Sequence, residues 1–202
     1  MLIKIINGSV TFGNNTILES INFELHEKEK IAIVGRNGCG KSTLLNALIN
    51  PDVLEEGIED EPLSIEFQKN IKIGYLEQTA IKNEENTLEE ELLSSFDDLR
   101  KLETKIKSLE ENMTNYELYD TLMQEFKQKG GYNYLGEINK ILPKFGFCLQ
   151  DKEKKIKEFS GGQRTKIAFI KLLLSKPNIL ILDEPTNHLD METIEWLEEY
   201  LS

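Results

Sequence analysis

The sequence has little of what marks membrane, secreted or disulfide-bonded proteins. No apolar run approaches the roughly 20 residues that a membrane-spanning helix needs, and the first residues lack the long apolar core of a signal peptide. Only two cysteines, Cys39 and Cys148, are present, and they form no disulfide or metal-binding pattern. These absences predict a cytoplasmic protein in a reducing compartment, without an integral membrane segment.

Positive charge is scarce relative to negative charge. The 36 Asp and Glu residues outnumber the 24 Lys and Arg residues, which gives a formal net charge of −12. Nonspecific affinity for nucleic acid comes largely from cations that neutralise phosphates. The excess of acid therefore argues against such binding, and any contact with nucleic acid would have to rest on a local patch. At 202 residues the chain has the length of one domain or slightly more.

The most informative segment is a glycine-rich loop at residues 35–43, Gly-Arg-Asn-Gly-Cys-Gly-Lys-Ser-Thr. It follows an apolar run at residues 31–34, short enough for a buried strand, and precedes residues 44–49, which predict a helix. In such an arrangement glycines let successive backbone N–H groups point at one anion, and the positive helix end adds to the attraction. In the pattern Gly-x-x-x-x-Gly-Lys-Ser, Lys41 reaches the terminal phosphates and Ser42 ligates Mg²⁺. We therefore expect a polyphosphate here.

Ahead of this loop, residues 1–30 predict an antiparallel β segment. Apolar and polar residues alternate, and breaks with turn chemistry fall at Asn7-Gly8 and at residues 13–15. Phe12 stands just before the second break, where its ring could stack on a purine. As an isolated aromatic it would more often be part of a core.

Two further apolar runs, residues 71–76 and 179–182, predict strands after the loop. The second run is apolar throughout, as in a strand that is buried on both faces of a parallel sheet. It delivers Asp183 and Glu184 at its carboxyl end, where ligands bind in such sheets. Buried acids are costly unless they have a function, so this pair is a candidate for the site.

The middle of the chain is predicted to be helical. From Thr87, a suitable N-cap, apolar residues recur every three or four positions, and a second such stripe runs from Leu118 to Phe126. Neither stripe can be buried without a partner, so we expect a helical hairpin over residues about 87–129. Its charged outer faces are most simply a solvated surface.

More helices are predicted at residues 134–142, from Arg164 to Leu174 and after residue 191. Ser160 is well placed as the N-cap of the second of these helices. The glycines that follow Ser160 make a second possible anion cradle, because they stand at a helix start.

Taken together, these segments resemble an ATP-binding cassette (ABC) ATPase. The glycine-rich loop, Gln78, residues 159–163, the strand that ends at Asp183, and residues 188–190 occur in the order of that family. The implied fold class is α/β, a P-loop NTPase of ABC type. It has a mixed sheet with an N-terminal antiparallel β part and an inserted helical subdomain with an arm-like hairpin.

The resemblance also implies a domain division. Residues 1–78 and 159–202 would form the ATP-binding core, and residues 79–158 would form the helical subdomain that includes the hairpin.

The resemblance assigns roles to the matching residues, with ATP and Mg²⁺ as cofactors. Glu184 would polarise the attacking water, and Lys41 and Gln78 would be the other catalytic residues. Ser42, Gln78 and Asp183 would attend the metal. In this family the segment that begins at Ser160 contacts the γ-phosphate bound to an opposing cassette. The residues implied to bind nucleotide are Phe12, Gly35, Arg36, Asn37, Gly38, Cys39, Gly40, Lys41, Ser42, Thr43, Ser160, Gly161, Gly162 and Gln163.

Residues 183–190, Asp-Glu-Pro-Thr-Asn-His-Leu-Asp, resemble most closely the soluble ABC-F branch of the family. The stretch between Gln78 and Ser160 is also longer than the helical subdomain of a transporter cassette usually is. In the ABC-F branch two cassettes share one polypeptide, and a helical arm contacts the ribosome and transfer RNA. The implied partners are a second cassette in the full-length protein and the ribosome, with its rRNA and tRNA.

A complete cassette also has a switch histidine near the γ-phosphate, and neither His26 nor His188 stands in that position. The sequence therefore resembles the front portion of a first cassette, and we expect this fragment alone to hydrolyse ATP weakly or not at all. Two alternatives stay open. One is an ATPase subunit of an ABC membrane transporter, with a membrane subunit docking near Gln78, and the other is a DNA-associated cassette of the soluble branch.

Overall fold

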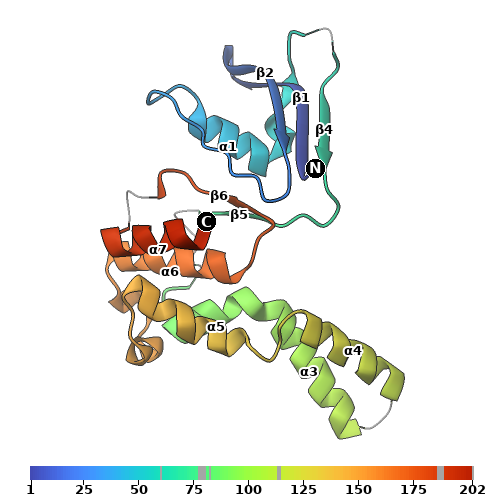
Figure 1. Ribbon diagram of the computed structural model, residues 1–202, viewed down its shortest axis with the longest axis vertical. Coiled ribbons are helices and arrows are strands. Elements are labelled where there is room, and N and C mark those ends of the chain that lie inside the picture. Colours follow the sequence, from blue (N-terminus) through green and yellow to red (C-terminus); the bar gives the residue numbers. More distant parts are fainter. Residues whose placement is uncertain (60, 77–80, 82, 113–114, 186–188, 202) are drawn as a thin grey trace. The chain divides into compact units, whose positions relative to one another are not determined.

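The computed structural model describes residues 1–59, 61–76, 81, 83–112, 115–185 and 189–201. The chain divides into two compact units (Figure 1). Unit 1 comprises Met1–Tyr75 with Pro177–Asp183, and unit 2 comprises Leu76–Lys176 with Glu184–Ser202. Unit 1 is therefore built from two separate stretches of sequence.

Unit 1 begins with a long antiparallel hairpin of β1 (Ile3–Phe12) and β2 (Asn15–Leu25). The turn between them confirms the break predicted at residues 13–15. The break predicted at Asn7-Gly8 is wrong, because β1 continues through it. Asn7 adopts a φ of 51° and the pairing register with β2 shifts at this point. A strand can thus contain a residue in the left-handed conformation where its hydrogen-bonding register shifts, as at a β-bulge.

The side chain of Asn7 explains why β1 does not end there. It is fully buried, and its Nδ2 donates to the backbone carbonyls of Glu59 (3.1 Å) and Glu61 (2.5 Å). Its Oδ1 accepts from the backbone N–H of Glu59 (3.3 Å). These bonds fasten the acidic stretch around residues 59 and 61 to the inner strand of the sheet.

Two more strands pair with β1 on its other edge. β3 (Glu55–Glu56) and β4 (Ser64–Phe67) both run antiparallel to it, and β4 was not evident from the sequence. The expected strands near residues 71–76 and 179–182 form as β5 (Ile73–Tyr75) and β6 (Ile179–Ile181), which pair in parallel. The single mixed sheet that we expected is therefore wrong for the described residues, in which the strands form an antiparallel sheet and a separate parallel pair.

Residues 31–34 do not form the predicted buried strand. They have no strand assignment, and Ile31 and Val34 are 45% and 92% exposed. A strand needs a neighbour to satisfy its backbone hydrogen bonds. Among the described residues no strand pairs with this run, although β2, β5 and β6 each have an open edge. The apolar composition of the run indicates a tendency to be buried, but it cannot supply the pairing partner.

The helix after the glycine-rich loop packs on the core of unit 1. This helix, α1 (Lys41–Ile49), includes the predicted helical residues 44–49 and ends at Ile49. It contributes Ala47 and Leu48 to the core. The other buried members of this core come from the sheets and their connections: Leu2, Ile3, Ile5, Val10, Leu54, Ile179 and Ile181.

Unit 2 opens with α2 (Leu88–Leu93), which starts at the N-cap that the sequence predicts. The Thr87 hydroxyl accepts from the Glu90 N–H (3.2 Å), and the Glu90 carboxylate accepts from the Thr87 N–H (2.8 Å). This capping box satisfies two backbone donors at the helix start.

The apolar stripe does not continue as one helix. The 3₁₀ turn η2 (Ser94–Phe96) separates α2 from α3 (Asp97–Asn112). The Ser94 hydroxyl donates to the Glu91 carbonyl (2.6 Å), and the Ser95 hydroxyl donates to the Lys171 carbonyl (3.2 Å). Serine side chains that bond to backbone groups in this way compete with regular helix geometry.

The expected helical hairpin is formed by α3 and α4 (Tyr116–Gln128), which Figure 1 shows projecting from the rest of unit 2. Leu102, Ile106 and Phe126 are buried. After α4 the chain turns at Gly130, with a φ of 76°. The helix pair spans residues 97–128 and is thus shorter at its start than the hairpin expected over residues about 87–129.

The rest of unit 2 is helical and encloses its own core. The remaining elements are α5 (Tyr134–Ile141), η3 (Leu142–Phe145), η4 (Leu149–Glu153), η5 (Ile156–Glu158), α6 (Gly161–Leu174) and α7 (Met191–Leu201). The Phe145 ring contacts those of Phe169 and Trp196 (centroids 5.9 and 5.2 Å apart). Within the described residues, no helix combines the length and the apolar composition required to cross a membrane.

A buried ion pair links α2 to α6. Glu91 is only 2% exposed. One of its carboxylate oxygens pairs with the Lys171 ammonium, and the other accepts from the Asn86 side-chain amide (3.1 Å). Removing one member of such a pair leaves a poorly solvated charge.

Replacing Glu91 by alanine is therefore expected to destabilise unit 2. Breaking a buried pair costs about 3–5 kcal/mol, and because the Lys171 side chain is 21% exposed we expect the lower end of that range. Urea unfolding followed by circular dichroism measures the loss. As a control, Glu125→Ala breaks the exposed pair with Lys129 and should cost less than about 1 kcal/mol. Equal losses in the two variants would contradict the buried role of Glu91.

Candidate nucleotide-binding site

The glycine-rich loop of unit 1 leads directly into α1 and requires glycine at two positions. Gly40, the N-cap of α1, has a φ of 95°, and a Cβ there would lie 2.9 Å from Cδ2 of Leu18. A Cβ on Gly35 would lie 2.6 Å from the Sγ of Cys39. The backbone therefore takes a path that residues with side chains could not follow without displacement of their neighbours.

The start of α1 is left open by this choice of residues. Because glycine has no side chain, Gly40 cannot cap the N–H groups of the first turn. The loop residues before it are exposed. An exposed helix start of this kind attracts anions through its N–H groups and its dipole. This geometry fits a phosphate group.

Lys41 adds a full positive charge at the same place. It is the first residue of α1, and its ammonium donates to the backbone carbonyls of Gly35 (3.1 Å) and Arg36 (3.2 Å). A cation at the positive end of a helix is electrostatically unfavourable in the absence of an anion. Lys41 thus has a position that phosphate binding would explain and that helix stability alone would not.

Ser42 and Asp183 meet although 141 positions separate them in the chain. The Ser42 hydroxyl donates to Oδ2 of Asp183 at 2.7 Å. A hydroxyl that donates its one proton in this way keeps its lone pairs available. Hydroxyl and carboxylate oxygens are the ligands that Mg²⁺ prefers. Both residues belong to unit 1, so the structure brings together two of the three predicted metal ligands.

For the other predicted residues of this site, the structure gives burial but no side-chain hydrogen bond with Ser42 or Asp183, or does not describe them. Thr43 is half-buried in the first turn of α1. Phe12 is 62% exposed at the end of β1, so the alternative of a core aromatic is wrong. Gln78 lies outside the described residues, as does His188.

Glu184 directly follows Asp183 but belongs to unit 2. Its φ of 46° is in the left-handed region, which is uncommon for a residue other than glycine. Such backbone strain occurs often at functional sites. It is consistent with a special role for Glu184 and does not define that role.

The second candidate anion cradle stands at the start of α6 in unit 2. The Ser160 hydroxyl accepts from the Gln163 N–H (3.3 Å), and the Gln163 side chain accepts from the Ser160 N–H (2.9 Å). The predicted N-cap at Ser160 is thereby confirmed. Gly161 and Gly162 are exposed, and a Cβ on either would meet nothing within 4 Å. These two glycines leave the helix start accessible to a large ligand or to another protein surface.

Sequence reasoning missed an ion pair next to these segments. The Asp190 carboxylate accepts from the Thr193 N–H (2.9 Å) at the start of α7 and pairs with the Lys166 ammonium. The Lys166 hydrogen bond, followed by that of Thr193, lowers the pKa of Asp190 to about 2. The carboxylate is therefore charged at neutral pH. An Asp three residues before a Thr was a usable N-cap signal, whereas nothing local indicated Lys166.

Comparison with known proteins agrees with this geometry. Residues 18–187 match the sequence profile of the family described as ABC transporter. The Bacillus subtilis (strain 168) protein YdiF is 42% identical over the whole chain, which corresponds to 32% of that protein. ABC transporter F family member 5 of Arabidopsis thaliana is 32% identical over 98% of the chain and 30% of its own length. The chain thus spans about a third of the length of these curated relatives.

Solved structures show the same fold. The structure of an ATP binding subunit of an ABC transporter superposes with a TM-score of 0.67 at 21% identity, over 98% of this chain and 72% of the other. The structure of cbiO1 from Clostridium perfringens gives a TM-score of 0.58 at 23% identity, over 99% of this chain and 72% of the other. Since the family profile covers most of the chain, and the phosphate loop and the Ser42–Asp183 contact agree with it, the chain belongs to the ABC transporter family as an ATPase domain of that family.

Proposed function

We propose that this chain binds ATP with Mg²⁺ at the glycine-rich loop and, when a second cassette faces it, hydrolyses ATP to drive a conformational change. The observation that carries the proposal is the Ser42–Asp183 contact beside the uncapped start of α1. The helix start favours a phosphate, and the oxygens of Ser42 and Asp183 favour a divalent cation. Both features lie in unit 1.

The chemistry required is mainly electrostatic. Phosphoryl transfer needs neutralisation of charge on the phosphates and a well-positioned water more than covalent participation by the protein. Lys41 and the first-turn N–H groups would neutralise the phosphates, and Ser42 and Asp183 would hold the metal, with Gln78 as a further ligand. Mg²⁺, when bound, would stabilise the negative charge of the reacting phosphates. Glu184 would orient and polarise the attacking water.

The accessible start of α6 supports the need for a second cassette. Residues 160–163 carry a helix start that is open to an external surface, and in this family the corresponding segment acts on a nucleotide held by the opposing cassette. The chain also spans about a third of its curated relatives. We infer that the full-length protein supplies a second cassette.

We further propose that the protein belongs to the ABC-F branch and acts on the ribosome as a translation factor or as an antibiotic-resistance protein. Two relatives of Arabidopsis thaliana, ABC transporter F family member 5 and member 2, support the assignment. The hairpin of α3 and α4 supports it too, because an arm of this kind is the ribosome-contacting element of the branch. The alternative is the ATPase subunit of an ABC membrane transporter.

The phosphate-facing role of Lys41 predicts a large loss of ATP affinity in Lys41→Ala. A hydrogen bond to a charged group contributes about 1.5–3 kcal/mol, so titration with a fluorescent ATP analogue should show binding weakened by about tenfold to a hundredfold. Lys69→Ala, which removes an exposed lysine elsewhere in unit 1, is the control and should bind normally. Unchanged affinity in Lys41→Ala would refute the phosphate loop assignment.

The metal role predicts that Ser42→Ala and Asp183→Asn lose the benefit of Mg²⁺. In the wild-type chain ATP should bind more tightly with Mg²⁺ than with EDTA, and each variant should reduce that ratio by about tenfold. Isothermal titration under both conditions measures it. A full Mg²⁺ effect in both variants would show that other residues hold the metal.

The ribosome proposal predicts ATP-dependent pelleting of the full-length Glu184→Gln protein with purified ribosomes. This variant should bind ATP and hydrolyse it slowly, because the water-polarising carboxylate is gone, and should therefore stay in the closed state. Sedimentation with ATP and without nucleotide gives the comparison. Intact ATP binding without pelleting would instead favour the transporter alternative, which recovery with membranes would then support.

A further inference from the structure

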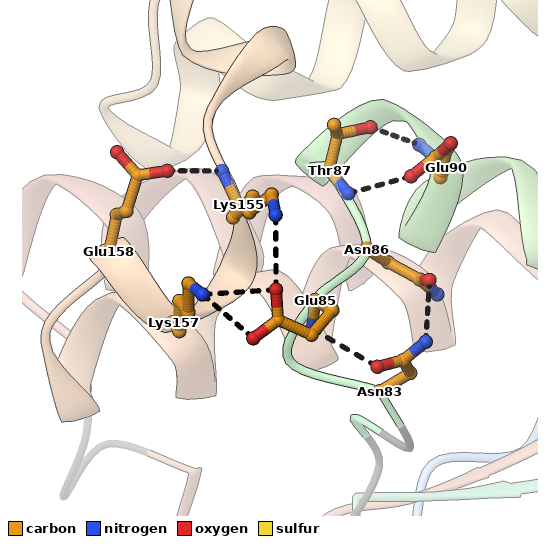
Figure 2. A network of polar contacts seen from close by, with 8 residues as sticks. All are labelled: Asn83, Glu85, Asn86, Thr87, Glu90, Lys155, Lys157 and Glu158. Atoms are coloured by element: carbon orange, nitrogen blue, oxygen red, sulfur yellow. Dashed lines mark hydrogen bonds and ion pairs between the residues drawn. The ribbon is translucent and has the colours of Figure 1, made fainter.

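The residues that lead into Ser160 are tied to a segment far away in the sequence, residues 83–88 (Figure 2). Both segments belong to unit 2. Three backbone hydrogen bonds join them: Leu88 N–H to the Lys154 carbonyl (2.9 Å), Ile156 N–H to the Asn86 carbonyl (2.9 Å), and Lys157 N–H to the Glu84 carbonyl (3.1 Å). The approach to α6 is therefore not an independent loop.

Glu85 adds a layer of charge to this contact. Its carboxylate accepts from the Lys157 ammonium at 2.7 and 3.0 Å and from the Lys155 ammonium at 3.0 Å, as Figure 2 shows. The hydrogen bonds from Lys157 and then Lys155 hold the pKa of this carboxyl below its ordinary value. The Glu85 carboxylate thus pairs with two ammonium groups from the segment that leads into Ser160.

Arg164 makes the contact that reaches α6 itself. Its Nη1 donates to the Glu84 carboxylate at 2.5 Å, and its Nε donates to the Phe159 carbonyl at 3.1 Å. Phe159 is the residue before the N-cap Ser160, and its side chain is buried. A single guanidinium therefore holds both the backbone that enters the helix and the distant segment 83–88.

The electrostatics of this arrangement argue for a geometric role. A cation in the first turn of a helix is unfavourable, so Arg164 has no stabilising effect on α6 by its charge alone. The pair with Glu84 is partly exposed, with side chains 35% and 57% accessible, and exposed pairs contribute little to stability. The planar guanidinium does, however, fix two acceptors in defined directions.

We propose that Arg164 is a positioning residue, which through Glu84 and the Phe159 carbonyl sets the direction in which residues 160–163 face the nucleotide of the opposing cassette. The inference rests on the proposed function, because these residues meet a nucleotide only when two cassettes pair. Glu84 also follows Gln78 closely in the chain. The contact between Glu84 and Arg164 thus joins the stretch after Gln78 to the start of α6, which carries the predicted nucleotide-binding residues 160–163.

The test uses the full-length protein and steady-state ATP hydrolysis. Arg164→Gln should lower kcat about tenfold, because misplaced groups lose catalysis steeply, while KM for ATP and the affinity of a fluorescent ATP analogue change less than about twofold. Glu84→Gln should also lower kcat, because it removes the carboxylate that pairs with Arg164. The matched control is Lys176→Gln, which removes one positive charge from an exposed pair with Glu137 on α5 and should leave kcat unchanged.

Rescue separates positioning from a general loss of structure. The exchange of both residues, Arg164→Glu with Glu84→Arg, should recover part of the kcat lost in each single reversal, a coupling that a double-mutant cycle measures. If Arg164→Gln does not fold, the Glu84 variants still decide the matter.

A kcat for Arg164→Gln and Glu84→Gln equal to that of Lys176→Gln would overturn the inference and leave the proposed function intact. Absence of hydrolysis in the wild-type full-length protein would instead refute the proposed function itself.

Discussion

The nucleotide site depends on a helix whose start the chain leaves unsatisfied. Elsewhere in this protein, Thr87, Asn115 and Ser160 cap α2, α4 and α6 with their side chains. At α1 the corresponding residue is Gly40, which has no side chain, and the next residue is a lysine. Stability alone would favour the opposite choice at both positions. An anion bound at this helix start would offset these unfavourable choices, as the proposed nucleotide site requires.

Features that depend on neighbouring residues in the chain could be predicted from the sequence. The phosphate loop, the helix that follows it and the N-caps at Thr87 and Ser160 all lie within a few positions of the residues that determine them. The pairing of α3 with α4 could also be predicted from the sequence, because the apolar stripe of each helix indicated that it packs against a partner.

Features that depend on distant partners could not be predicted. Residues 31–34 have the composition of a buried strand, yet no strand in the described part of the chain pairs with them. Asn7 has turn chemistry but lies inside a strand, because residues 59 and 61 satisfy its side chain. The partners of Glu91 and Arg164, namely Lys171 and Glu84, lie 80 positions away in each case. No local pattern encodes such a pairing, and only the packed chain reveals which cations and carboxylates meet.

The division of the chain has a consequence for biosynthesis. Unit 1 is interrupted by most of unit 2, and it is completed only by the stretch that carries β6 and Asp183. Chains emerge from the ribosome N-terminus first and fold as segments become available. The phosphate loop is therefore synthesised long before the carboxylate that Ser42 contacts, and β5 must wait for its parallel neighbour. When α3 and α4 have been synthesised, unit 1 still lacks Pro177–Asp183. Unit 1 is completed only when this stretch packs against residues 1–75, which closes a loop of about a hundred residues.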